Sequence, residues 1–115
     1  MNKGARILVV EDEGLLAMMI QEMLEDLGFE VPDVASTLSE GIGLVETGAY
    51  DAAILDVSLH GENSFPIASL LAEKGIPFAF SSGFSLEDIA PEFADRPLLR
   101  KPYQFNELEG ILAAF

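Results

Sequence analysis

The sequence has no cysteine and few basic residues, and each shortage excludes a class of function. None of its 115 residues is Cys, which excludes disulfide bridges and thiolate metal sites. Only 6 Lys and Arg stand against 20 Asp and Glu, which gives a net charge of −14. Because binding to a phosphate backbone needs Lys and Arg to displace counterions, nucleic acids and anionic membranes are poor candidate partners. Cations and proteins with basic surfaces suit this charge better.

A long apolar run is also missing, and no basic, apolar leader precedes the first apolar stretch. A membrane span needs about 20 apolar residues, so we expect no membrane insertion and a cytoplasmic location. Half of the residues are hydrophobic, which is typical of a globular chain and not of a disordered acidic one. The length fits a single domain over residues 1–115 with its own hydrophobic core.

Short apolar runs alternate with segments of helical periodicity along the chain. The runs that predict strands cover residues 6–10, 29–36, 52–57, 76–81 and 97–100. Pro32 places the second of them at a sheet edge. Five such strands, each followed by a predicted helix, indicate a parallel sheet with helices on both faces. The sequence therefore predicts a three-layer α/β fold.

The predicted helices follow from apolar spacing and capping patterns. The first covers residues 14–27, with one apolar stripe made of Leu16, Met19, Ile20, Met23, Leu24 and Leu27. A capping box at Thr37 and Glu40 begins the second helix, which buries Leu38, Ile42 and Val45. Ser64 caps a third helix that ends at Gly75, and residues 85–89 form a short fourth one. Asn106 and Glu109 cap the last helix, which buries Leu108, Ile111, Leu112 and Phe115.

Polar residues stand where four of the five predicted strands end. These are Glu11-Asp12-Glu13, Asp56, Ser81-Ser82 and Arg100-Lys101, whereas the second strand ends without an ionisable group. In open parallel sheets, binding sites form at the carboxyl ends of the strands. We therefore expect these side chains to meet at one edge, with the second strand at the side of the sheet.

Carboxylates gathered in this way repel one another and need a cation. At about 4 Å and an effective dielectric of about 20, each pair costs roughly 4 kcal/mol. Lys101 supplies one positive charge, and Mg²⁺ takes one or two carboxylates together with waters and phosphate oxygens. A metal, a hydroxyl and an ammonium group are the parts that phosphoryl transfer requires. In this interpretation, Asp56 is the nucleophile and forms an aspartyl phosphate.

The motifs VVEDE, LDVSL, a Ser before Gly83, and KPY follow the first, third, fourth and fifth predicted strands. In this order they resemble the receiver domain of bacterial two-component response regulators, over essentially the whole chain. The resemblance implies a flavodoxin-like sheet of order 2-1-3-4-5. It also implies a Mg²⁺-dependent switch that a sensor histidine kinase or a phosphotransfer protein phosphorylates. Such a domain catalyses only its own phosphorylation and dephosphorylation, and is not otherwise an enzyme.

The resemblance also assigns roles to residues. Asp56 corresponds to the phosphoacceptor, and Asp12 and Asp56 to direct Mg²⁺ ligands. Glu11 corresponds to a residue that acts nearby or through water, and the Ser58 backbone carbonyl completes the metal ligands. A second group contacts the phosphoryl group: Ser82 corresponds to the switch hydroxyl and Lys101 to the cation that pairs with it.

The chain departs from the family where most members have an aromatic switch residue, because Leu98 stands three positions before Lys101. The stretch FAFSSGF resembles a subgroup with a Phe-Ala-Thr-Gly-type signature that also lacks this aromatic, and Phe84 is the candidate replacement. Leu15 and Met18 lie off the main stripe of the first helix. They are either partly buried or form the docking patch for the kinase. Because the chain ends just after its last predicted helix, we expect output through a downstream protein, phosphorelay or a phosphorylation-linked homodimer.

Other interpretations of the same residues stay open. The acids at residues 11–13 also suit a helix N-terminus, Ser82 a turn and Lys101 an exposed surface. A pseudo-receiver would keep the fold and bind proteins without being phosphorylated. A hydrolase of the haloacid-dehalogenase kind would need an acid where Ser58 stands, and a nucleotide-binding domain would need a glycine-rich loop in place of VVEDEGL. His60 is a lone histidine in a loop, where we expect it to be solvated.

Overall fold

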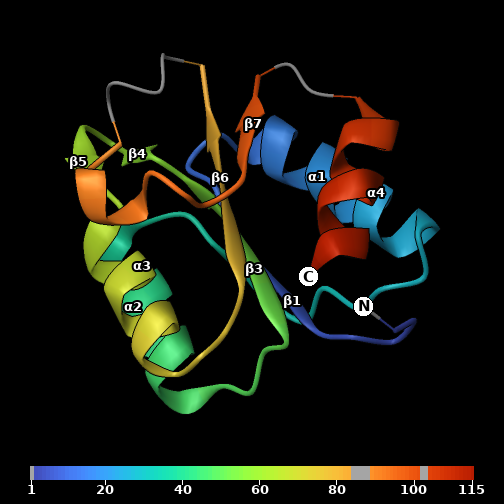
Figure 1. Cartoon of the computed structure of the whole chain (residues 1–115), viewed down its shortest axis with the longest axis horizontal. Coiled ribbons are helices and arrows are strands. Elements are labelled where there is room, and N and C mark those ends of the chain that lie inside the picture. Colours follow the sequence, from blue (N-terminus) through green and yellow to red (C-terminus); the bar gives the residue numbers. More distant parts are fainter. Residues whose placement is uncertain (1, 84–88, 102–103) are drawn as a thin grey trace.

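A five-stranded parallel sheet runs through the centre of the computed structural model, which describes residues 2–83, 89–101 and 104–115 (Figure 1). Its strands lie in the order β2-β1-β3-β6-β7, which confirms the predicted order 2-1-3-4-5. Their bounds are β1 (Ile7–Val10), β2 (Val34–Ala35), β3 (Ala52–Asp56), β6 (Phe78–Ser82) and β7 (Leu98–Arg100). The strand without an ionisable end is β2, and it lies at the edge of the sheet as expected.

Helices pack on both faces of the sheet in the described part of the chain (Figure 1). On one face lie α1 (Gly14–Asp26) and α4 (Phe105–Ala114), and on the other lie α2 (Leu38–Thr47) and α3 (Phe65–Glu73). Successive residues of β3 point to opposite faces, so Ile54 packs with the first pair of helices and Leu55 with the second. The predicted three-layer fold is therefore confirmed. No helix in the described ranges is both long and apolar enough to cross a membrane.

The second strand is shorter than predicted because proline interrupts it. Residues 29–36 were expected to be extended, yet only Val34 and Ala35 pair with β1 as a strand. Glu30 forms an isolated bridge with Arg6, and Pro32 between these pairings has no N–H to donate. The result is an edge strand of two residues beside β1.

The N-cap residues of α2 and α3 are the predicted Thr37 and Ser64, but only Thr37 forms a capping hydrogen bond through its side chain. The Glu40 N–H donates to Thr37 Oγ1 over 3.2 Å, as the capping box requires, while the Glu40 carboxylate accepts from Ser36 instead of Thr37 N–H. Ser64 is the N-cap residue of α3, as predicted, but its side chain makes no capping hydrogen bond. The Asn63 Oδ1 atom accepts from the Phe65 N–H over 3.2 Å and takes that place.

At α4 the predicted cap lies two residues too late. The helix begins at Phe105, and Gln104 and Glu107 form the reciprocal capping box. The predicted pair, Asn106 and Glu109, has the same spacing, but Asn106 already lies in the first turn. Leu108 and Leu112 nevertheless face the core as expected, because a shifted start leaves the helical period unchanged.

The apolar stripe of α1 is narrower than predicted. Ala17, Ile20 and Leu24 are buried and define the core side, whereas Met19 is 45% exposed. Met19 is adjacent to Ile20 and is therefore turned by about 100° away from it. The predicted helix at residues 85–89 lies outside the described residues except for Ile89, and a short 3₁₀ helix, η2 (Pro91–Phe93), follows.

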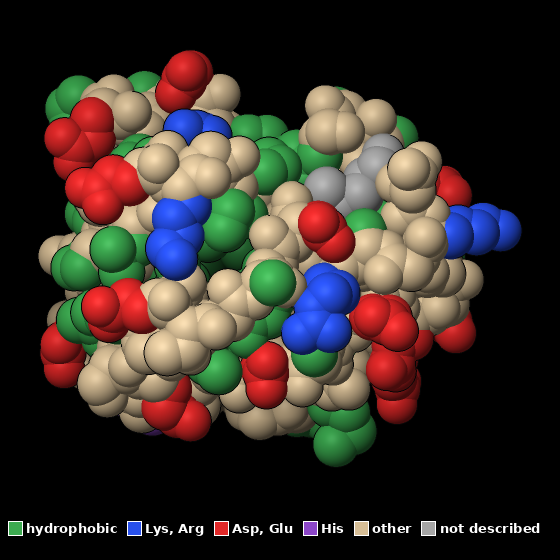
Figure 2. Space-filling view, turned by 90° about the horizontal axis from the view of Figure 1, so that it is seen from below, with side chains coloured by type: hydrophobic (Ala, Val, Ile, Leu, Met, Phe, Trp, Pro, Cys, Tyr) green, Lys and Arg blue, Asp and Glu red, His purple; other side chains and the backbone are tan. Residues whose placement is uncertain are grey.

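On the face opposite the carboxyl ends of the strands, acidic side chains are scattered and do not form one patch. Figure 2 shows this face, where a few basic side chains lie among the acidic ones. The net charge of −14 is therefore not concentrated in a single acidic patch on this face.

Candidate functional site

Three carboxylates meet at the carboxyl end of the sheet. Because Val10 pairs with Leu55 in parallel register, the next residues, Glu11 and Asp56, are neighbours at the ends of β1 and β3. Asp12 follows Glu11, and one carboxylate oxygen from each of the three residues lies within 4.8 Å of the others. Glu11 is 1% exposed and Asp56 is 6% exposed. The sheet register thus brings together acids that lie 45 positions apart in the sequence.

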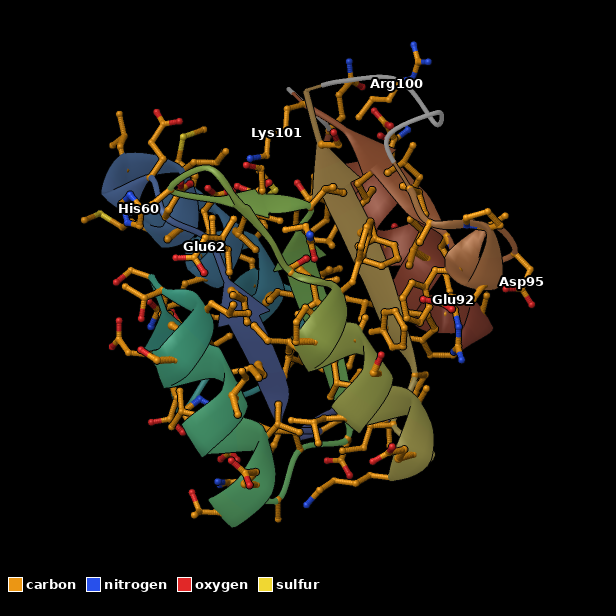
Figure 3. All side chains as sticks on the ribbon, turned by 90° about the vertical axis from the view of Figure 1, so that its left-hand side faces the viewer. His60, Glu62, Glu92, Asp95, Arg100 and Lys101 are labelled. Carbon is orange, nitrogen blue, oxygen red and sulfur yellow. The ribbon has the colours of Figure 1, made fainter. Side chains whose placement is uncertain are left out.

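Lys101 neutralises part of this negative charge from the far side of β6. Its Nζ atom lies 2.8 Å from Glu11 Oε1 and 3.0 Å from Asp56 Oδ2. The backbone N–H of Lys101 donates to the Ser82 carbonyl over 2.9 Å, which fixes the start of this side chain beside the end of β6. Figure 3 shows Lys101 at the carboxyl edge of the sheet, while the adjacent Arg100 extends outward and is exposed.

Burial and mutual interaction shift the pKa values of these groups. Burial raises the pKa of Asp56 to about 7, with a further contribution from Glu11, although Lys101 opposes the shift. Burial disfavours the charged form of Lys101, but Glu11 and Asp56 outweigh it and raise the pKa of Lys101 above its usual value. The Asp56 carboxylate is therefore stabilised by one cation but not fully, and a second cation would favour its ionised form.

A β-hairpin that the apolar pattern of the sequence does not predict holds Asp12. The hairpin pairs β4 (Ser58–Leu59) with β5 (Glu62–Asn63), and His60 and Gly61 form its turn with φ values of 49° and 83°. The His60 N–H donates to Asp12 Oδ2 over 2.9 Å. Partial burial disfavours the Asp12 carboxylate, but this hydrogen bond and the interactions of Asp12 with the side chains of Glu11 and Asp56 lower the pKa of Asp12.

His60 and Gly61 both have positive φ, which is typical of the two central residues of a type I′ hairpin turn. The dipeptide His60-Gly61 is therefore the sequence signal for this hairpin. The His60 ring is 61% exposed, in agreement with the expected solvation, and its Nδ1 atom lies 3.9 Å from Asp12 Oδ2 (Figure 3). The contribution of His60 to the site is its backbone, which no side-chain motif reveals.

The remaining predicted residues take different positions. The Ser58 N–H donates to Asp56 Oδ1 over 3.3 Å, so this residue contacts the site through its backbone. Ser82 is buried at the end of β6, and its carbonyl accepts the Lys101 N–H. Leu98 is partly buried and packs on the core between the sheet and the α2–α3 pair. Phe84, the predicted replacement for the switch aromatic, lies outside the described residues.

An exposed apolar patch lies on α1 beside the acidic end of the sheet. Leu15 is 67% exposed and Met18 is 56% exposed, so the alternative of partial burial for these two residues is wrong. Met19 and Phe105 are also exposed, at 45% and 41%. We name Leu15, Met18, Met19 and Phe105 the α1–α4 patch. Leu15, Met18 and Met19 belong to α1 and Phe105 begins α4, two helices on the same face of the sheet.

The donors at this end of the sheet fit a hard divalent cation. Three carboxylates against the single ammonium of Lys101 leave an excess of negative charge among the described site residues. Mg²⁺ prefers oxygen ligands at about 2.0–2.1 Å and usually keeps several waters. The close approach of the three carboxylates is consistent with such a site, in which carboxylate oxygens would bind the ion directly or through water.

Comparisons with known proteins agree on one family. Residues 7–113 match the family described as the response regulator receiver domain. The transcriptional regulatory protein PdtaR of Mycobacterium tuberculosis is 32% identical over 107 residues, which cover 90% of this chain and 52% of PdtaR. The chain thus spans about half the length of this curated relative.

Solved structures with the same fold include close and more distant relatives. SdrG from Sphingomonas melonis Fr1 is 43% identical with a TM-score of 0.88, and the match covers 99% of this chain and 98% of SdrG. TrrA from Thermotoga maritima, solved in complex with Mg²⁺-BeF, is 26% identical with a TM-score of 0.83, covering 96% and 97%. With its sheet order, its acidic cluster and the match over residues 7–113, this chain belongs to the response regulator receiver domain family.

Proposed function

We propose that this chain is a phosphorylation-dependent signalling switch, which accepts a phosphoryl group on Asp56 from a sensor histidine kinase or a phosphotransfer protein. The observation that carries the proposal is the position of Asp56. Its carboxylate lies at the end of a core strand, ion-paired to Lys101 at 3.0 Å and clustered with Glu11 and Asp12. An acid buried there only for stability would be a poor choice, because burial of a carboxylate is costly.

The transfer uses Asp56 as nucleophile. The bond between phosphorus and the donor histidine nitrogen breaks, the nitrogen keeps the electron pair, and a new bond forms from phosphorus to an Asp56 oxygen. Asp12 and Asp56 would bind Mg²⁺ directly, with the Ser58 carbonyl as a further ligand and Glu11 acting nearby or through water. The ion supplies charge neutralisation between the carboxylates and the incoming phosphoryl oxygens.

Lys101 and Ser82 would contact the phosphoryl group after transfer. Phosphorylation adds about 1.5–2 negative charges, which attract the Lys101 ammonium. Lys101 starts from the loop after β7 and Ser82 ends β6, so their movement would reshape the adjoining loops. Because Leu98 replaces the usual aromatic, the switch would depend on these loops, with Phe84 as the candidate residue in place of a β7 aromatic.

The α1–α4 patch is the proposed docking surface for the phosphodonor. Leu15 and Met18 project from the helix that begins directly after the acidic cluster, so a helix packed on them would lie close to Asp56. Met19 and Phe105 extend the same apolar surface. A downstream protein target or a second copy in the phosphorylated state would receive the signal by contact, or the phosphoryl group would pass on by phosphorelay.

The experiment that tests this function is intact mass spectrometry after incubation with acetyl phosphate and Mg²⁺. We expect a gain of one phosphoryl group, which is lost in Asp56→Asn and in the presence of EDTA. Asp95→Asn is the matched control, because Asp95 is exposed and lies far from Lys101 (Figure 3). Residues 1–115 would behave as one receiver domain in this experiment.

Two other results would separate the alternatives. Mg²⁺ binding without phosphorylation by acetyl phosphate would call for a repeat with a phosphorylated histidine kinase. A failure there as well would exclude the proposed switch. Neither Mg²⁺ binding nor phosphorylation would identify a pseudo-receiver, whose role is protein contact alone.

A further inference from the structure

Ser81 has an unusual position among the buried polar groups. Its side chain is 1% exposed, and its Oγ atom has no hydrogen-bond partner among the described residues. A buried hydroxyl without a partner is costly, so its presence calls for an explanation, such as a role at a functional site. The β6 strand continues from Ser81 to Ser82, the residue assigned to the phosphoryl group above.

Sheet register places Ser81 on the same face as Asp56. The two residues are direct partners in the parallel pairing of β3 and β6. The preceding partners, Ile54 and Ala79, both pack in the core beneath α1 and α4. Since side chains alternate along a strand, Asp56 and Ser81 continue this face, whereas Ser82 begins on the opposite one.

Lys101 crosses this face of β6 to reach Asp56. The strand order is β3-β6-β7, and the backbone of Lys101 is bonded to the end of β6. Leu99, two residues earlier on β7, is the register partner of Ser81 and packs in the same core cluster. The stem of Lys101 therefore passes over the end of β6 on the side where Ser81 lies, before its Nζ atom meets the carboxylates.

An ammonium group has three hydrogens to donate. Lys101 Nζ forms ion pairs with Glu11 at 2.8 Å and with Asp56 at 3.0 Å. Charged acceptors outcompete a neutral hydroxyl such as that of Ser81. When a metal ion engages the carboxylates, a phosphoryl oxygen would replace the Asp56 contact of the ammonium, and the N–H that faces Glu11 would be left to find another acceptor. The Lys101 side chain is only 20% exposed, so water is a poor replacement for that acceptor.

We propose that Ser81 is a positioning residue for Lys101, and that its hydroxyl accepts a hydrogen bond from the ammonium group in the phosphorylated state. This inference rests on the proposed function, because it concerns the same site after phosphorylation. Ser81 would hold the ammonium directed at the phosphoryl group, beside the separate contact from Ser82. The Ser81 hydroxyl that has no partner in the free protein would then accept the hydrogen bond from Lys101 in the phosphorylated protein.

The test compares Ser81→Ala with the wild type in binding Mg²⁺ with beryllofluoride, a phosphoryl analogue, by calorimetry. We expect Ser81→Ala to bind beryllofluoride roughly three- to tenfold more weakly, the loss that one hydrogen bond typically causes. Ser81→Thr keeps the hydroxyl and should restore most of the affinity. Ser64→Ala is the matched control, because Ser64 Oγ is also buried without a partner among the described residues.

A spectroscopic readout separates positioning from packing. The ¹⁵N resonance of Lys101 Nζ should show slower hydrogen exchange in the wild type with Mg²⁺ and beryllofluoride than in Ser81→Ala under the same conditions. Equal affinity and equal exchange in the two proteins would overturn the inference, as would an equal loss of affinity in Ser64→Ala. If the wild type binds neither Mg²⁺ nor beryllofluoride, the proposed function fails first and this inference with it.

Discussion

The Lys101 ammonium lies 3.0 Å from the Asp56 carboxylate although a whole strand, β6, separates the strands from which the two residues project. The contact exists only because the sheet order is β3-β6-β7 and because Lys101 begins just beyond the end of β7. The ion pair between Lys101 and Asp56 therefore connects the ends of β3 and β7, the strands on either side of β6. A phosphoryl group on Asp56 would act on this connection directly, and through it on the loops that follow β6 and β7.

The raised pKa of Asp56 predicts that the metal-free protein loses stability as the pH rises. The folded value is about 7 against 3.8 for an unperturbed carboxyl, so the folded state binds more protons between these values. The free energy of unfolding should fall from pH 5.5 to pH 8 by an amount on the order of 1–4 kcal/mol. Urea unfolding in EDTA measures this difference.

In Asp56→Asn the pH dependence of the free energy of unfolding should largely disappear, because the substituted side chain does not titrate. Asp95→Asn is the control for the loss of one exposed acid and should keep the wild-type slope. Lys101 contributes nothing in this range, since its pKa is raised above an already alkaline value. An unchanged slope in Asp56→Asn would show that the carboxyl of Asp56 is ionised throughout.

Mg²⁺ should stabilise the protein at pH 8, where the three carboxylates repel one another most. A concentration ten times the dissociation constant adds about 1.4 kcal/mol to the free energy of unfolding, or several degrees in the melting temperature. Asp12→Asn removes one carboxylate of the acidic cluster and should abolish most of this gain. Glu46→Gln, which removes an exposed acid of α2, should keep it. Equal stabilisation of both variants would place the ion elsewhere.

The sheet and the acidic cluster could be predicted because both depend on long-range order that the sequence pattern reveals. Parallel strands place their carboxyl ends at one edge, so polar residues after successive apolar runs had to converge. Glu11, Asp12, Asp56 and Lys101 meet there as expected. Ser81 also belongs to a predicted strand end, but only the register shows that it shares a face with Asp56.

The details that escaped prediction depend on short or competing signals. The strands β4 and β5 have two residues each, too few for a periodic pattern, and the bond from His60 to Asp12 uses the backbone. Two capping boxes with equal spacing compete at the start of α4. Met19 lies at the border of an apolar stripe, where exposure depends on packing that the period alone does not determine.

The competing caps of α4 can be separated by two substitutions. The Glu107 carboxylate accepts from the Gln104 N–H over 3.1 Å, so Glu107→Ala should lower the free energy of unfolding by about 0.5–1 kcal/mol. Glu109→Ala removes an exposed acid of the same helix and should change the free energy of unfolding by less than about 0.5 kcal/mol. Thermal unfolding of the pair measures the difference. A larger effect of Glu109→Ala than of Glu107→Ala would support Asn106 and Glu109, the pair predicted from the sequence, as the cap of α4.

The hairpin turn at His60 combines backbone strain with a hydrogen bond to Asp12 of the acidic cluster. His60 has a φ of 49°, which costs a residue with a side chain about 1–2 kcal/mol, while its N–H holds Asp12. His60→Gly relieves the strain and keeps the N–H, so it should raise the free energy of unfolding by roughly 0.5–1 kcal/mol and leave Mg²⁺ affinity unchanged. Urea unfolding and Mg²⁺ titration measure the two quantities.

His60→Pro is the opposite substitution at the same turn. Proline has no N–H and fixes φ near −65°, so the hydrogen bond to Asp12 and the turn are lost together. We expect Mg²⁺ affinity and stability to fall in this variant, the latter by more than about 1 kcal/mol. If His60→Gly weakened Mg²⁺ binding as much as His60→Pro does, the imidazole 3.9 Å from Asp12 would be the important group and not the backbone amide.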